Sequence, residues 1–157
     1  MVGRVFPDRV DNNYAGYRIA VWLLALIAAS RVFMGANIIL NTGHVAKTAD
    51  RIPLDQFPPD AAQTVTAMFA LLGLFHLLFA IVALLVVFRY RALVSFVYLL
   101  LLAQLIGSRL ILTAHPIPRA DAPPVGFTVN LVIGALLLIG FVLSLLRRAS
   151  SPEASDS

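Results

Sequence analysis

The chain has 157 residues, of which 60% are hydrophobic and only 13% charged, and its mean hydropathy is +0.88. A water-soluble domain is nearer half apolar and a quarter charged, so this composition indicates that lipid is the solvent. Because the sequence contains no cysteine, disulfides, iron–sulfur ligation and cysteine-based zinc sites are excluded. It also contains no motif for nucleotide binding, a nucleophilic triad or nucleic-acid recognition.

Four stretches of the chain are long and apolar enough to cross a bilayer, which takes about 20 residues of helix. They cover about residues 17–40, 65–88, 92–113 and 127–146. The sequence therefore predicts an all-α, four-transmembrane-helix bundle, flanked by tails at residues 1–16 and 147–157. The second tail is short and polar, and we expect it to be disordered.

The first span contains a permanent charge, Arg31, roughly 20 Å from one end of its helix and 14 Å from the other. An alternative reading makes "AVWLLALIAAS" the core of a signal peptide that is cleaved before Arg31. The long leader with Asp8 and Asp11, and the apolar pattern that continues to Leu40, favour a membrane span instead.

The second span follows a proline-rich connector, in which Asp60 and Gln63 resemble a capping box that would open the helix. Small residues gather on one face of this span and are typical of tight helix packing in lipid. The face comprises Gly73, His76, Ala80 and Ala83.

A tight basic turn at residues 89–91 leads into the third span, which carries Gln104, Ser108 and Arg109 towards its far end. The fourth span follows a second proline-rich connector. Small or polar residues recur there at every fourth position, at Gly126, Asn130 and Gly134. This spacing again favours close approach between helices.

The distribution of Lys and Arg predicts the orientation in the membrane. Seven of these residues lie in the tails, at the adjoining end of the first span or in the short turn, whereas three lie in the two longer connectors. The positive-inside rule then places both termini in the cytoplasm. We expect a multi-pass protein of the cell membrane, specifically a bacterial inner membrane.

Ionisable residues inside a bilayer are costly, and are therefore functional candidates. The first three spans each contain one such residue, at Arg31, His76 and Arg109, and no Asp or Glu lies in any span. Most polar residues of the spans lie in the half away from the tails, whereas the opposite half is nearly pure aliphatic. This pattern argues against a proton pump or a transporter with a polar path. The predicted ligand-binding set is Arg31, Asn37, His76, Gln104, Ser108 and Arg109.

Each member of this set also has a structural interpretation. Arg109 lies near a span end, where its side chain can reach the headgroups. Arg31 is deeper and needs a carbonyl, an Asn or Gln side chain, a connector aspartate or an external anion, whose carboxylate or phosphate suits its guanidinium fork. His44 and His115, just beyond two spans, are a weaker alternative for haem or metal binding; the sequence predicts no catalytic residue or metal site and does not identify a cofactor.

The linked pattern "SRVFMGANIILNTGHVAK" resembles the opening of the small DoxX-like membrane proteins. It has Arg31, then Gly35, a glycine near the helix end at Gly43, and Lys47 beyond it. The stretches "VVFRYRALVSFVYLLLLAQL" and "VNLVIGALLLIGFVLSLL" are similar to the family's basic turn with its third span and to its last span. The resemblance covers roughly residues 20–146.

The chain departs from that family in two places, so it is similar to a divergent member. His76 stands where the family often has Glu, and the glycine-rich end after the fourth span is missing. The resemblance implies a four-helix bundle, which in some members of the family serves as the membrane subunit of a redox complex, such as thiosulfate–quinone oxidoreductase or a complex that handles oxidative stress, whereas many members have no known activity.

Two functions follow as expectations. The first is a subunit or scaffold without catalytic activity of its own, whose partners are the bilayer and a membrane protein or further copies of the chain, with no role for nucleic acid. The alternative is a binder of a quinone-like or anionic lipid-like molecule, in an outward-facing pocket within the membrane.

Overall fold

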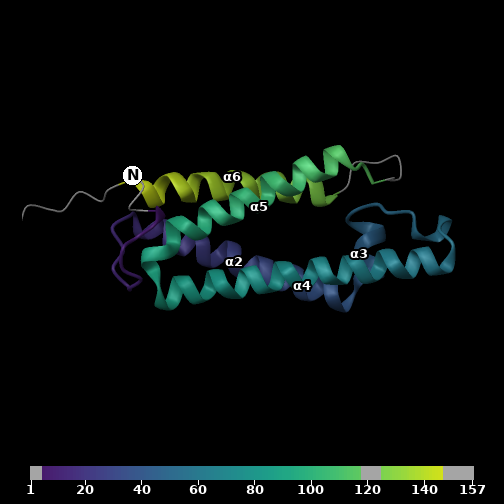
Figure 1. Ribbon diagram of the computed structural model, residues 1–157, viewed down its shortest axis with the longest axis horizontal. Helices are drawn as coiled ribbons and strands as arrows, with labels where there is room; N and C mark the ends of the chain where they lie inside the picture. Colours follow the sequence, from purple (N-terminus) through teal and green to yellow (C-terminus); the bar gives the residue numbers. More distant parts are fainter. Residues whose placement is uncertain (1–4, 118–124, 147–157) are drawn as a thin grey trace, which may run out of the picture.

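The computed structural model describes residues 5–117 and 125–146, and every regular element in these ranges is a helix. Figure 1 shows four long helices that run side by side. The long helices are α2 (Arg18–Leu40), α4 (Pro59–Arg89), α5 (Val94–Ala114) and α6 (Val125–Leu145). The short ones are α3 (Thr42–Thr48) and the 3-10 turns η1 (Leu54–Gln56) and η2 (Arg91–Leu93).

The predicted all-α four-helix bundle is confirmed, with one notable shift of a boundary. Helix α4 begins at Pro59, about six residues before the predicted span, and its 31 residues extend about 46 Å. The predicted capping box is wrong, because Asp60 lies inside the first turn and Pro58 takes the N-cap position without a side-chain hydrogen bond. Proline suits this start, since its missing N–H would have no partner there.

The bundle has two distinct ends. At the tail end, the start of α2 meets the end of α6, and the Tyr17 N–H donates to the Leu143 carbonyl at 3.3 Å. Both described ends of the chain, residues 5 and 146, and the α4–α5 turn lie at this end. The loop end holds α3, η1 and the start of α6. Residues 147–157, predicted to be disordered, lie outside the described residues.

Helices α2 and α4 approach each other closely at two glycines, Gly35 and Gly73. A Cβ added at Gly35 would lie 2.9 Å from the Leu77 backbone nitrogen and 3.0 Å from the Gly73 carbonyl oxygen. A Cβ at Gly73 would lie 2.7 Å from Ile38 Cγ2. The predicted small-residue face of α4 is therefore buried against α2, as small residues allow in lipid.

The main core lies nearer the tail end and is centred on Tyr98. This side chain is fully buried, and its hydroxyl donates to the Ala20 carbonyl at 2.7 Å. Its ring packs against Gly140, where an added Cβ would overlap the ring. Tyr98 thus joins α5 to the first turn of α2 and to the backbone of α6.

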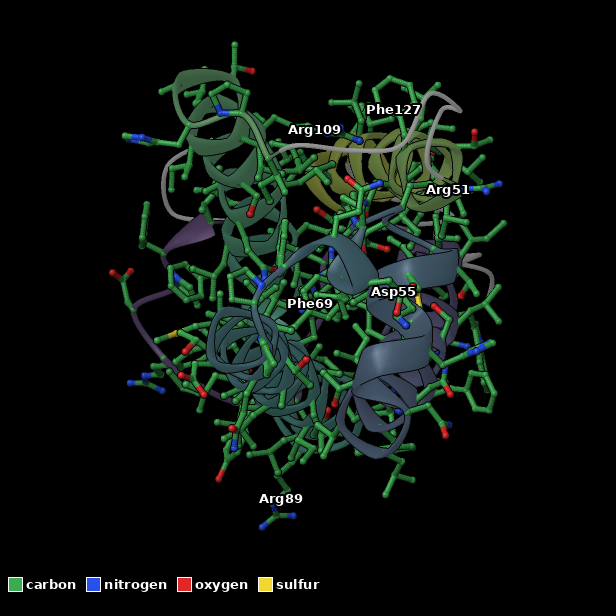
Figure 2. All side chains as sticks on the ribbon, turned by 90° about the vertical axis from the view of Figure 1, so that its right-hand side faces the viewer. Arg51, Asp55, Phe69, Arg89, Arg109 and Phe127 are labelled. Atoms are coloured by element: carbon green, nitrogen blue, oxygen red, sulfur yellow. The ribbon has the colours of Figure 1, made fainter. Side chains whose placement is uncertain are left out.

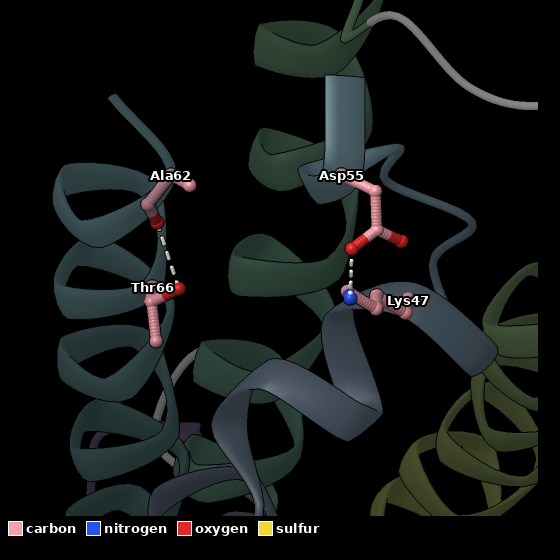
Figure 3. Close-up of polar contacts among 4 residues, drawn as sticks. All are labelled: Lys47, Asp55, Ala62 and Thr66. Carbon is pink, nitrogen blue, oxygen red and sulfur yellow. Dashed lines mark hydrogen bonds and ion pairs between the residues drawn. The ribbon is translucent and has the colours of Figure 1, made fainter. Parts of the chain in front are cut away.

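The loop end is closed by a small second cluster, in which Ala46, Ile52 and Leu54 pack together. Figure 3 shows the ion pair between Lys47 on α3 and Asp55 on η1 that spans this cap. Between them, Arg51 adopts a left-handed backbone conformation with φ 58°. The cap also holds α6, because the Gly126 N–H donates to the Ala49 carbonyl at 3.2 Å.

Most of the helical surface faces outward and is apolar. Within the most apolar window of each long helix, between 22% and 39% of the residues are buried by the rest of the chain. Large side chains such as Trp22, Phe33 and Leu40 are at least 75% exposed. Four helices of this length and composition suit a bilayer and define a multi-pass membrane protein.

Candidate functional site

Arg31 is buried between α2 and α5, with 4% of its surface exposed. Its Nη1 donates to the Gln104 Oε1 at 2.8 Å, so the charge is held by a neutral amide on a neighbouring helix. Its Nε is buried and has no hydrogen-bond partner. The sequence left carbonyls, Asn or Gln side chains, connector aspartates and an external anion open as partners for Arg31, and the partner seen is the amide oxygen of Gln104.

His76 lies on α4 and is partly buried. Its Nδ1 lies 2.9 Å from the Leu72 carbonyl one turn earlier, which occupies one ring nitrogen within its own helix. The charges of Arg31 and Asp50 both act on the ring. Asn37 on α2 is likewise engaged locally, since its Oδ1 accepts from the Asn41 Nδ2 at 2.8 Å.

Arg109 turns towards α6 instead of joining Arg31. Its guanidinium carbon lies 4.6 Å from the centre of the Phe127 ring, a cation–π contact, and its Nη2 lies 3.5 Å from the Phe127 carbonyl. Figure 2, which looks onto the loop end, shows Arg109 beside Phe127 and apart from Arg51 and Asp55. Ser108 is exposed and donates to the Gln104 carbonyl at 2.8 Å.

The predicted set is therefore divided. Arg31 and Gln104 bond directly, His76 lies within electrostatic reach, and Asn37, Ser108 and Arg109 make separate contacts. Within residues 5–117 and 125–146, no group of three or more His, Asp or Glu side chains is placed to hold a metal. The arrangement ties helices together, and it leaves one buried donor of Arg31 unused.

Sequence reasoning missed a pocket at the tail end of the bundle. A cavity of about 110 Å³ lies between the segment before α2, the start of α5 and the end of α6. Its polar lining comprises Asn13, Tyr14, Ser95 and Ser144. The residues before α2 were predicted to be a cytoplasmic tail, and only the hydroxyls of Ser95 and Ser144 within apolar spans hinted at a polar site there.

The Tyr14 hydroxyl is buried in this pocket and has no hydrogen-bond partner. Burial raises the pKa of Tyr14 to about 12, so the hydroxyl is neutral and able to donate at physiological pH. Gly16 makes room for it, because a Cβ there would lie 2.5 Å from the Tyr14 Oη and 2.6 Å from the Ser144 carbonyl oxygen.

Comparison with protein-family models, with curated proteins and with solved structures finds no match. The fold itself defines the class of this protein, an all-α, multi-pass membrane protein built as a four-helix bundle. The resemblance to DoxX-like proteins stays a prediction from the sequence.

Proposed function

We propose that the chain is a DoxX-like, non-catalytic subunit or scaffold of a membrane complex, with a redox complex as the setting that the resemblance implies. The observation that carries this proposal is the outward face of α5 at Gly107. A Cβ added at Gly107 meets nothing within 4 Å, whereas those at Gly35, Gly73 and Gly140 would strike a neighbouring helix. Gly107 is thus a helical glycine that the described fold does not use.

The surroundings of Gly107 support a helix-binding role. Ala103 and Ala114 lie on the same face of α5, four residues before and seven after, and both are exposed. Small residues at such spacing let a second helix approach closely in lipid, where contact between backbones replaces the hydrophobic effect as the driving force. Glycine in a helix interior otherwise destabilises it by roughly 0.5–1 kcal/mol relative to alanine.

Filling this face tests the proposal. We expect wild-type protein, purified in mild detergent, to retain a stoichiometric partner that native electrophoresis and mass spectrometry detect. Gly107→Leu should fold normally but retain about tenfold less partner, which corresponds to a loss of about 1.4 kcal/mol. Gly43→Leu is the matched control, because a Cβ at Gly43 also meets nothing but lies on α3.

Two results would contradict the scaffold proposal. One is a wild-type chain that purifies alone after mild extraction. The other is a Gly107→Leu variant that keeps its partner as well as Gly43→Leu does.

The orientation is part of the same proposal. With both termini in the cytoplasm of a bacterial inner membrane, the tail end faces inward and the loop end outward. Because the chain has no cysteine, single cysteines report cleanly. On intact cells, a membrane-impermeant maleimide should label Gln56→Cys but not Asp8→Cys, and both positions are exposed. Labelling of Asp8→Cys alone would reverse the assignment.

A second candidate function is the binding of a quinone-like or anionic lipid-like molecule at Arg31. The observation that favours it is the buried Arg31 Nε without an acceptor, which a carbonyl, carboxylate or phosphate oxygen would satisfy. Mass spectrometry of the purified protein should then show a retained small molecule that is lost in Arg31→Met. If no such molecule is retained, or if Arg31→Met keeps it, this second function is rejected.

A further inference from the structure

The tail-end pocket is chemically unlike the rest of the bundle. Its surface is mainly apolar but includes four residues with polar side chains, and none of its lining residues carries a formal charge at neutral pH. Its volume of about 110 Å³ accommodates a group of several heavy atoms, since one water needs only roughly 10–15 Å³ by this measure. A neutral group that both donates and accepts hydrogen bonds, such as a diol, suits this lining.

The hydrogen-bonding groups that line the pocket also favour an occupant that forms hydrogen bonds. The Tyr14 hydroxyl has no partner, although a buried hydroxyl of this kind is normally satisfied. The Ser95 hydroxyl reaches the Ser144 carbonyl only at 3.5 Å, a weak contact, and Ser95 is 3% exposed. Two buried hydroxyls at the pocket wall are thus without strong hydrogen bonds in the described fold.

The segment that covers the pocket, residues 5–16, which we term the strap, is attached to the helices at several points. The Ala92 N–H donates to the Asp11 carbonyl at 3.2 Å, and the rings of Phe6 and Phe96 lie 5.7 Å apart. The strap joins α2 at Tyr17. Tyr14 packs against the main core and Gly16 is buried against α6, so the strap is part of the pocket wall.

Positive charge surrounds the pocket at the level where the long helices end. Arg9 belongs to the strap, Arg18 begins α2, and Arg89 and Arg91 flank the turn before Ala92. All four are exposed, but Figure 2 shows Arg89 directed away from the bundle on the side opposite α6, which leaves Arg9, Arg18 and Arg91 as the candidates to contact a phosphate at the pocket. Helix ends of this kind lie at the headgroup level, where basic side chains attract lipid phosphates.

We propose that the tail-end pocket binds the neutral polyol headgroup of an anionic glycerophospholipid, with the headgroup beneath the strap and the phosphate among the surrounding arginines. Tyr14 and Ser95 supply hydrogen bonds to the headgroup hydroxyls. The site is independent of the Gly107 face and of Arg31, both of which lie elsewhere in the bundle.

Phosphatidylglycerol and phosphatidylserine separate headgroup recognition from charge, because both carry one net negative charge and only the first ends in a neutral diol. We expect native mass spectrometry of the purified protein to show about fivefold tighter binding of phosphatidylglycerol, as one or two net hydrogen bonds provide. Tyr14→Phe should remove most of this preference. Tyr17→Phe, at a more exposed tyrosine of the same end, should keep it.

Ser95→Ala provides a second variant in case the strap shifts in Tyr14→Phe, and it should also reduce the preference for phosphatidylglycerol. Equal binding of the two lipids by the wild-type protein would overturn the proposal, as would a preference that both variants retain. Free glycerol that competes as strongly as phosphatidylglycerol would also overturn it, because the occupant would then be a soluble polyol.

Discussion

Replacing Gly140 with alanine is expected to destabilise the bundle by about 3 kcal/mol, the upper part of the usual range for overpacking. The added Cβ would overlap the Tyr98 ring. That ring has nowhere to move, since Tyr98 is fully buried and its hydroxyl is held by the Ala20 carbonyl. Thermal unfolding in mild detergent would measure the loss as a lower midpoint.

Gly107→Ala is the matched control for Gly140→Ala, because it makes the same change in a helix interior where the Cβ meets nothing. It should be neutral or stabilising by roughly 0.5–1 kcal/mol. A smaller residue at position 98, as in Tyr98→Leu, should reduce the cost of Gly140→Ala. If the two glycine variants unfold at the same temperature, the close packing of α5 on α6 described here is wrong.

Gln104→Leu is expected to destabilise the protein by about 2 kcal/mol, because it removes the acceptor of a buried charged donor. Arg31→Met should cost less, since it removes the charge and keeps an unbranched side chain of similar length. Ser108→Ala, one turn along α5, serves as the control and should stay within about 0.5 kcal/mol of wild type.

The double variant Arg31→Met/Gln104→Leu isolates the coupling between the two residues. It should be more stable than Gln104→Leu alone, because an apolar pair replaces a buried charge that has lost its acceptor. Purely additive losses would show that the Arg31–Gln104 contact does not link α2 to α5. Unchanged stability, ligand and partner content in Arg31→Met would remove any special role for Arg31.

The four spans could be predicted because their hydropathy is strong and their lengths match a bilayer. Hydropathy alone placed the start of α4 too late, because the turn from Pro59 to Thr64 carries polar side chains and lies outside the apolar window, whereas the Asp60–Gln63 pair indicated a helix start close to the observed one. Helix formation there follows from the proline at the first helical position, not from hydropathy. The buried face of α4 could be predicted from the sequence, since Gly73, Ala80 and Ala83 share a helical face.

The sequence predicted the members of the candidate site only in part, because the angular positions of residues around a helix decide which of them meet. Gln104 and Arg109 are five residues apart, which places them about 140° apart around a helix. They therefore face different neighbours, although both lie in the same half of the membrane. Ser108, about 40° from Gln104, shares its face instead. A similar depth in the membrane therefore does not by itself place two residues in the same site.

The tail-end pocket depends on tertiary structure that no local pattern reveals. It requires the strap, the start of α5 and the end of α6 to meet, and these segments are far apart in the chain. Tyr14 precedes any apolar run, so hydropathy assigns it to a tail. The hydrogen bond from Ala92 to the strap at Asp11, and the one from Tyr17 just after the strap to α6, both use backbone groups, which carry no side-chain signature.

The contact between Arg31 and Gln104 also has a consequence for biosynthesis. The two residues are 73 positions apart, so the first helix must enter the membrane while the third is still being translated. During that interval, the nascent α2 carries an arginine without its acceptor, at an insertion cost of about 3 kcal/mol when the residue lies near mid-membrane. The arrival of α5 supplies the Gln104 acceptor and reduces this cost, so we expect α5 to stabilise α2 in the bilayer.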